Sequence, residues 1–348
     1  MLKKRDLLLD FLLIFTSILG LFSLLAVNKY YFKLQLYFLI ISLIVYLFMS
    51  SLSAIWVRTI INNLYIIIFI LLIYLLLFGE SIRGSASWIT LGFVNFQPGE
   101  FFKAITAYLV ANIFTQQTKK RTKVIKTIFL LGIPLILVLL QPDFGTFIIL
   151  FGIIFSIYFF SQMSIKSFIV SIVLFISISL IGFSFLQPYQ KNRITSFLNP
   201  ANSSLEAGYN VNQAKIAIGS GGIFGKGFKN NTQVQLNFLP EAHTDFIFAA
   251  ASESFGLFFS IVLIISLGLI IKKLAKYSFN SKLNLSTRYY SFGLLFIIFT
   301  QTFLNIGMNM GLVPVTGLTL PFISYGGTSL ITLFFALGIL QKKIINKD

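Results

Sequence analysis

Long apolar runs, separated by short polar segments, recur from one end of the chain to the other. Most of these runs are long enough for a helix to cross a bilayer, which takes roughly 20 residues. The pattern predicts ten membrane-spanning helices, at residues 7–27, 35–56, 60–79, 100–117, 127–141, 144–160, 166–187, 246–271, 289–309 and 321–341. We therefore expect an all-α polytopic membrane protein in which residues 1–348 form a single domain.

The first apolar run follows a short basic segment that contains Lys3, Lys4 and Arg5, as a secretory signal peptide would. However, the run is too long for the apolar core of a signal peptide, and no small-residue cleavage site follows it. We therefore expect the first helix to be retained as a membrane span.

The composition agrees with a membrane protein and excludes several kinds of chemistry. Apolar residues make up 57% of the chain, charged residues make up 11%, and the mean hydropathy is +0.89, which excludes an ordinary soluble domain. Because the chain has no cysteine and one histidine, it has no thiol catalysis, disulfide or histidine-rich metal site. The net charge of +17 comes from basic residues scattered between the spans, which argues against a nucleic-acid partner.

The basic residues instead indicate how the chain is oriented. They gather at alternate ends of the predicted spans, as is typical of cytoplasmic loops. The clusters are Lys3–Arg5, Lys119–Lys126, Lys272–Arg288 and Lys342–Lys347. Both termini are therefore predicted to be cytoplasmic.

Most acidic residues fall on or near the opposite, outer face. They are Glu80, Glu100, Asp143, Glu206, Glu241, Asp245 and Glu253. The two long connections lie on the same face, at residues 80–99 and at residues 188–245 between the seventh and eighth spans. Acidic residues contribute little to orientation, and structureless connections this long are often functional. We therefore expect an outward-facing reaction or binding site.

The most informative stretch is Leu239–Gly256, where a polar loop turns into an apolar helix. It brings together Glu241, His243 and Asp245 at the predicted membrane boundary. A carboxylate there is costly to desolvate, so it is a functional-site hypothesis by default. His243 either relays protons or holds the loop through a hydrogen bond, and we favour the second role.

Two other outer segments place charged residues at helix starts. Glu100 and Lys103 are three residues apart at the start of the fourth span, so they share a face and can form an ion pair. This pair either orients a polar substrate or only complements the helix dipole. Asp143, in the turn between the fifth and sixth spans, either caps the next helix or faces the same cavity as Asp245.

Two glycine-rich segments are less specific. Gly219–Gly227 has five glycines in nine residues and resembles a phosphate-cradling loop, but its spacing fits neither GxGxxG nor a P-loop. It therefore indicates a tight turn or a close backbone approach. The basic residues of the long loop, Arg193 and Lys226 among them, suit an anionic partner such as a pyrophosphate, although loop solubility explains them equally well. Pro314–Ser329 has broken backbone at membrane depth. It indicates either a kinked packing element or a cavity wall with Ser324 and Tyr325 as polar contacts.

These segments, in this order, resemble those of the SEDS family (shape, elongation, division and sporulation), to which RodA and FtsW belong. The matching stretches are Gly92–Lys103, Gln141–Thr146, Arg193–Pro200, Gly208–Tyr209, Ile216–Gly222, Leu239–Gly256 and Val315–Ser329. The segments Gln190–Arg193 and Lys226–Pro240 look more like the RodA branch, whereas Ala242 is also common in the division branch. Gly99, Asn210 and Ser254 depart from the family pattern, but none of them removes a residue assigned to chemistry.

The resemblance implies a peptidoglycan glycosyltransferase with ten transmembrane helices. Such an enzyme polymerises lipid II on the outer face of the bacterial cytoplasmic membrane, releases undecaprenyl pyrophosphate and works with a class B penicillin-binding protein. Asp245 then takes the place of the essential carboxylate, with general base as its natural role. The expected substrate-binding residues are Glu100, Lys103, Asp143, Arg193, Lys226, His243, Ser324 and Tyr325. A divalent cation, Mg²⁺ or Mn²⁺, is expected on the pyrophosphate, and the sequence does not identify its ligands.

Other functions remain open at this stage. A lipid II flippase would also need a polytopic body and a polar cavity, but it predicts polar residues near the bilayer midplane rather than on one face. A non-catalytic scaffold for the cell-wall machinery would tolerate loss of Asp245. Within the family, elongation is expected and a division-specific role is the alternative.

Overall fold

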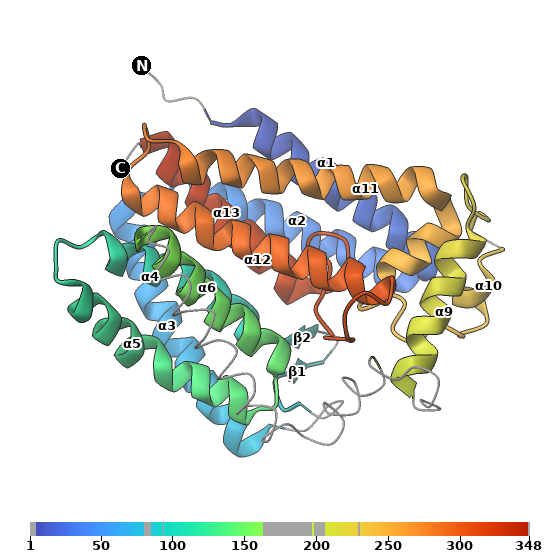
Figure 1. Cartoon of the computed structure of the whole chain (residues 1–348), viewed down its shortest axis with the longest axis horizontal. Coiled ribbons are helices and arrows are strands. Elements are labelled where there is room, and N and C mark those ends of the chain that lie inside the picture. The colour runs from blue at the N-terminus through green and yellow to red at the C-terminus, as the bar shows by residue number, and fades with distance from the viewer. Residues whose placement is uncertain are drawn as a thin grey trace.

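The computed structural model is a bundle of long helices, with a small hairpin and two shorter helices at one end (Figure 1). It describes residues 5–79, 85–92, 94–162, 197, 206–228 and 230–346. The helices are α1 (Leu7–Val27), α2 (Lys29–Ser51), α3 (Ala54–Phe78), α4 (Pro98–Thr115), α5 (Lys120–Leu140), α6 (Phe144–Gln162), α9 (Glu206–Ser220), α10 (Thr232–Gln235), α11 (Ile247–Phe279), α12 (Leu285–Asn309) and α13 (Gly327–Asn346). Strands β1 (Ile89–Leu91) and β2 (Val94–Phe96) pair antiparallel.

Eight of the described helices are long and apolar enough to cross a membrane: α1, α2, α3, α5, α6, α11, α12 and α13. Together with α4, they overlap nine of the ten predicted spans, with bounds that differ by up to about eight residues. The remaining predicted span, residues 166–187, lies outside the described residues. The mostly helical membrane fold is therefore confirmed for the part of the chain that the structure describes.

Polar caps explain why two helices begin earlier than the apolar runs predict. Helix α2 begins at Lys29, where the Asn28 side chain accepts a hydrogen bond from the Tyr30 N–H at 2.8 Å. Helix α12 begins at Leu285, where Asn284 accepts from the Thr287 N–H at 2.7 Å. Asparagine is a strong N-cap residue, so the polar first turn belongs to the helix although its hydropathy is low.

Helix α4 lies in the interior of the bundle, in contact with α3, α6, α12 and α13. Most of its residues are buried, including the polar side chains of Glu100, Lys103 and Thr106. Because protein rather than lipid surrounds this helix, it does not need the uniformly apolar surface of a lipid-facing span. Its position carries polar groups into the middle of the fold.

The two ends of the bundle differ in character. Helix α1 begins and helix α13 ends at one end of the bundle, whereas β1, β2, α9 and α10 lie at the other (Figure 1). Helix α11 packs against α1 and α12, and α13 packs along α2. The start of α1 and the end of α13 therefore lie on one side of the fold, and the assignment of that side to the cytoplasm stays a prediction.

A charged contact joins α1 to α11 at the end where α1 begins. The Lys273 ammonium lies 2.8 Å from the Asp6 carboxylate, which also accepts hydrogen bonds from the Tyr277 hydroxyl and the Leu9 N–H. Burial alone would raise the pKa of Asp6, but these donors outweigh it and hold the pKa below its ordinary value. Asp6 thus caps α1 and links it to α11.

Helix α11 is broken at Gly256, which has a left-handed φ of +78°. The glycine-rich loop after α9 packs into this break, since the N–H groups of Leu257 and Phe258 donate to the carbonyls of Gly222 and Ile223. A Cβ at Gly256 would collide with the Gly225 nitrogen and the Ile223 oxygen. The close backbone approach predicted for Gly219–Gly227 is therefore confirmed, and the backbone that this segment approaches is that of α11.

Candidate active site

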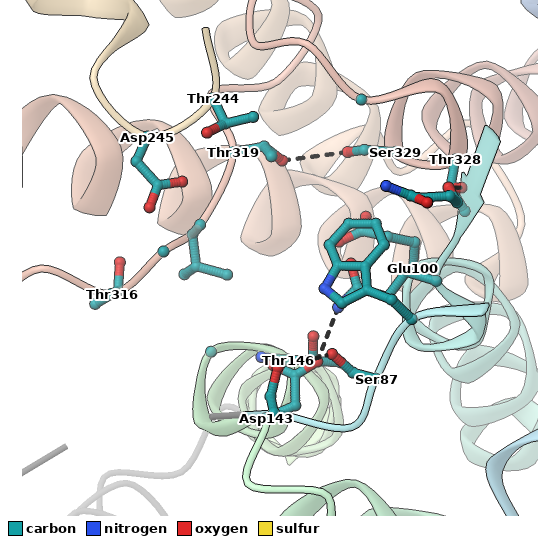
Figure 2. Close-up of a pocket in the computed structure, with 18 of the residues that line it drawn as sticks. Ser87, Glu100, Asp143, Thr146, Thr244, Asp245, Thr316, Thr319, Thr328 and Ser329 are labelled. Carbon is teal, nitrogen blue, oxygen red and sulfur yellow. Dashed lines mark hydrogen bonds between the residues drawn. The ribbon is translucent and has the colours of Figure 1, made fainter. Parts of the chain in front are cut away.

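A cavity of about 510 Å³ opens beside the hairpin, at the end of the bundle opposite the start of α1. Four polar segments line it: the hairpin with the start of α4, the α5–α6 turn, the segment before α11, and the irregular segment between α12 and α13. The main polar residues are Ser87, Asn95, Gln97, Glu100, Asp143, Thr146, Glu241, His243, Thr244, Asp245, Thr316, Thr319, Tyr325, Thr328 and Ser329. Residues far apart in the sequence therefore share one site, with Glu100, Asp143 and Asp245 reaching it from three segments (Figure 2).

Asp143 both caps a helix and lines the cavity. Its Oδ1 accepts from the Thr146 N–H at 3.0 Å at the start of α6, and its Oδ2 accepts from the Gln97 amide at 2.8 Å. Burial raises the pKa of Asp143 above its ordinary value, and the two hydrogen bonds and the charge of Lys103 offset this only in part. Asp143 therefore has both of the roles that the sequence left open: it caps the next helix and it faces the same cavity as Asp245.

Glu100 and Lys103 form a buried ion pair in the first turn of α4. The Lys103 Nζ lies 2.6 Å from the Glu100 Oε1, as their spacing predicts. Glu100 lines the cavity, whereas Lys103, only 2% exposed, is not among the lining residues and lies behind it. Lys103 therefore reaches a substrate only through its partner Glu100.

The segment before α11 is fixed through its backbone. The Tyr325 N–H donates to the His243 carbonyl at 2.9 Å, and the Ser324 hydroxyl donates to the Thr244 carbonyl at 2.7 Å. The side chains of Asn305 and Asn309 donate to the Asp245 carbonyl at 3.1 and 2.9 Å. Three consecutive carbonyls that precede α11 are thus bound by donors from α12 and from the segment before α13.

His243 packs as an aromatic ring on the cavity wall. Its ring stacks on Tyr31 of α2 with a centroid distance of 3.9 Å and an interplanar angle of 5°, and Tyr325 lies beside both rings. Its Nε2 lies 4.0 Å from the Glu241 carboxylate. This packing fixes the His243 ring in the cavity wall, and the role of His243 stays a prediction.

The irregular segment between α12 and α13 forms one wall of the cavity. Thr316 and Thr319 of this segment and Ser329 in the first turn of α13 turn hydroxyls toward the cavity, and the hydroxyl oxygens of Thr319 and Ser329 lie 3.3 Å apart (Figure 2). Tyr325 lines the cavity, whereas Ser324 is buried and bound to the loop backbone. Of the two readings of this segment, the cavity wall agrees with the structure.

Lys226 lies away from the cavity, because it pairs with Glu253 of α11. Its Nζ lies 2.9 Å from the Glu253 Oε1, which also accepts from the Gln233 N–H at 3.2 Å. Lys226 therefore anchors the glycine-rich loop and is not a lining residue. Arg193, the other basic candidate of the long loop, lies outside the described residues.

Sequence reasoning missed Asn305, Asn309 and Tyr31. Each lies in or beside an apolar run, where a lone polar or aromatic residue is most simply explained by packing. Two asparagines four residues apart near the end of a span share one helix face. That spacing is the one signal that could have identified the pair.

The described residues fit a protein-held divalent cation poorly. Among them, no three side chains of His, Cys, Asp or Glu come together as metal ligands. Gln97 and Thr146 already bind Asp143, and Lys103 pairs with Glu100. We therefore assign no metal ligands and derive no step through a cation.

Comparison with known proteins gives consistent matches. Residues 6–347 match the family described as FTSW_RODA_SPOVE, cell cycle protein. The chain is 38% identical over 301 residues to the peptidoglycan glycosyltransferase MrdB of Escherichia coli K12, which covers 82% of this chain and 79% of MrdB. It is 37% identical over 294 residues to the probable peptidoglycan glycosyltransferase FtsW of Coxiella burnetii, covering 82% of this chain and 78% of that protein.

Solved structures share the fold over nearly the whole chain. A chain of a peptidoglycan synthase complex that coordinates polymerization and crosslinking aligns with a TM-score of 0.82 at 26% identity, covering 99% of this chain and 98% of that one. The rod shape determining protein RodA of Thermus thermophilus aligns with a TM-score of 0.72 at 25% identity, covering 97% and 96%.

Proposed function

The chain belongs to the FtsW/RodA/SpoVE family of cell cycle proteins and is a peptidoglycan glycosyltransferase, and we propose that it polymerises lipid II with Asp245 as general base. The reaction takes place on the outer face of the bacterial cytoplasmic membrane. It serves cell elongation, which the similarity to MrdB and RodA supports.

The proposed step is a single displacement at an anomeric carbon. The 4-hydroxyl of the GlcNAc of one lipid II attacks C1 of the lipid-linked glycan chain, and its proton passes to the Asp245 carboxylate. The bond between C1 and the pyrophosphate oxygen breaks, and undecaprenyl pyrophosphate leaves with that electron pair. Because attack and departure are on opposite faces, the α-linkage becomes β. A positioned base contributes typically 10²–10⁴-fold to such a step.

The position of Asp245 is the observation that carries this assignment. It lies in the cavity, directly before α11, and its backbone carbonyl is bound by two buried side chains of α12. Asp245 therefore combines access to the cavity with a fixed backbone, and both are required of a base.

The charge of the lining favours a sugar over a pyrophosphate as the occupant of the cavity. Its described lining residues include four carboxylates, those of Glu100, Asp143, Glu241 and Asp245, and no Lys or Arg. Carboxylates accept hydrogen bonds from sugar hydroxyls and repel phosphate oxygens. We therefore place the acceptor sugar in the cavity and the pyrophosphate of the donor outside it.

The proposed partner is a class B penicillin-binding protein, which cross-links the glycan strands. The similarity to a chain of a complex that coordinates polymerization with crosslinking supports this partner.

The experiment that tests the proposal uses the purified full-length chain in lipid vesicles with lipid II, with and without the penicillin-binding protein. Glycan strands resolved by gel electrophoresis are the expected product. Movement of lipid II across the vesicle membrane without polymer would favour the flippase alternative and contradict the proposal.

A further inference from the structure

The first turn of α11 contains an inserted side chain. In an α-helix, each carbonyl accepts from the N–H four residues later, so a bond from the Ala249 N–H to the Asp245 carbonyl would extend the helix by one residue and make Asp245 its N-cap in place of Phe246. The Asn309 carboxamide occupies this place instead. Its Nδ2 donates to the Asp245 carbonyl at 2.9 Å, and its Oδ1 accepts from the Ala249 N–H at 3.1 Å.

This insertion provides a helix cap that the local sequence lacks. The residue before α11 is Phe246, which makes no side-chain cap hydrogen bond. The first N–H groups of a helix have no partner within it and need another acceptor. Asn309 supplies one from a different helix, α12.

The inserted Asn309 side chain and its neighbour Asn305 are held in place because both are buried and hydrogen-bonded. Asn305 and Asn309 have no exposed surface. Asn309 also donates to the Asn305 carbonyl at 2.8 Å, and Asn305 donates to the Leu318 carbonyl at 2.8 Å and to that of Asp245. Buried amides are almost always hydrogen-bonded, so moving the carboxamide of Asn305 or of Asn309 would leave buried polar atoms without hydrogen bonds.

We propose that Asn309, supported by Asn305, is a positioning residue that keeps Asp245 from becoming the N-cap of helix α11, so that its carboxylate faces the cavity. The proposal rests on the proposed function, because it gives Asn309 its importance through Asp245. An aspartate at the N-cap turns its carboxylate back to accept from the N–H groups of the first helical turn, here Ile247 or Phe248, and therefore away from a substrate in the cavity.

The expected behaviour of variants follows from the same geometry. In Asn309→Ala, the Asp245 carbonyl and the Ala249 N–H can bond to each other, so the chain still folds while Asp245 becomes the N-cap of α11. Asn309→Asp keeps the acceptor for Ala249 but places a second acceptor against the Asp245 carbonyl. In both variants we expect kcat to fall by roughly 10²-fold with little change in KM, since a misplaced catalytic group costs about this much.

The direct test reads the position of residue 245 without using activity. Because the chain has no cysteine, Asp245→Cys introduces a single thiol, which a charged, water-soluble thiol reagent labels only where it is accessible. In the full chain in vesicles, adding Asn309→Ala is expected to slow labelling by about tenfold, as thiol reactivity follows exposure. The matched control adds Gln301→Ala, which removes a buried amide of α12 that makes no hydrogen bond among the described residues. It is expected to leave the labelling rate unchanged.

Equal labelling rates with and without Asn309→Ala would overturn the positioning role, and Asn309→Asp provides the same comparison if the alanine variant does not fold. A second outcome is that Asn309→Ala slows labelling of Asp245→Cys but leaves kcat unchanged when Asp245 is present. This outcome would confirm the positioning of residue 245 and contradict Asp245 as the base. Failure of the positioning role of Asn309 and failure of Asp245 as the base are therefore distinguishable.

Discussion

Lys226 Nζ lies 2.9 Å from the Oε1 of Glu253, a side chain with no exposed surface, and this pair joins the glycine-rich loop to the broken helix α11. The same carboxylate oxygen accepts from the Thr232 hydroxyl and the Gln233 N–H. Glu253 therefore gathers the loop, α10 and α11 around one buried charge.

Removing the lysine should destabilise the fold more than neutralising the acid. Lys226→Met leaves a buried carboxylate without its counter-charge, which typically costs about 3 kcal/mol. Glu253→Gln keeps an acceptor for Gln233 and needs no counter-charge, so its cost should be smaller. Denaturant unfolding of the two single variants and the double variant in detergent would measure this. If Lys226→Met costs the same in the Glu253→Gln background as in the wild type, the two charges are not coupled.

A side chain at Gly256 should be poorly tolerated. Its φ of +78° disfavours any other residue, and a Cβ would meet the backbone of Gly225 and Ile223. We expect Gly256→Ala to destabilise the fold by roughly 2–4 kcal/mol, from backbone strain and overpacking together. The matched control is Gly268→Ala in the same helix, where a Cβ has open space. This control should be neutral or stabilising by up to about 1 kcal/mol. Equal effects at both glycines in a thermal unfolding assay would contradict the close approach.

The helices and the convergence of the outer carboxylates could be predicted from the sequence for physical reasons. A span needs a long apolar run, so the eight described helices that are long and apolar enough to cross a membrane all overlap predicted spans. A charged group at a membrane boundary is costly enough to indicate function. These reasons bring Glu100, Asp143 and Asp245 to one end of the fold, where the structure places them in one cavity.

The partners of several site residues could not be predicted because they come from distant segments. The cap of α11 comes from Asn309 of α12, and His243 packs on Tyr31 of α2. Lys226 has a local sequence that suits an anionic ligand as well as it suits an ion pair, and only the packing of the loop against α11 brings it to Glu253. Tertiary contacts of this kind leave no periodic pattern in the sequence.

Asp143 should make the protein less stable as its carboxyl ionises. A carboxyl whose folded-state pKa is raised contributes stability below its ordinary pKa and loses it as the pH rises through the raised value. Asp143→Asn retains an acceptor for the Thr146 N–H, and Gln97 can turn its amide to match. The variant should therefore be more stable than the wild type at pH 7, with the difference shrinking toward acid pH. A difference in Tm that does not change with pH would contradict this.

Asp6 should show the opposite pH dependence. Its pKa is lowered in the folded protein, so its contribution is present above the ordinary carboxyl pKa and is lost as the pH falls through the lowered value. We expect Asp6→Asn to destabilise the chain at pH 7, because Lys273 and the α1 cap lose their charged partner, and to approach the wild type in acid. Melting curves of both proteins across the acid range would measure this. A variant that is as stable as the wild type at pH 7 would show that the contact between α1 and α11 contributes nothing.

The rate of lipid II polymerisation by Asp245→Asn, measured in vesicles with the penicillin-binding partner present, tests the central claim most directly. The substitution preserves shape and removes the base, so we predict a fall in rate of roughly 10²–10⁴-fold. Asp143→Asn, a matched change in the same cavity, should cause a much smaller fall. Glycan strands formed by Asp245→Asn at a rate near that of the wild type would contradict the assignment of Asp245 as the general base.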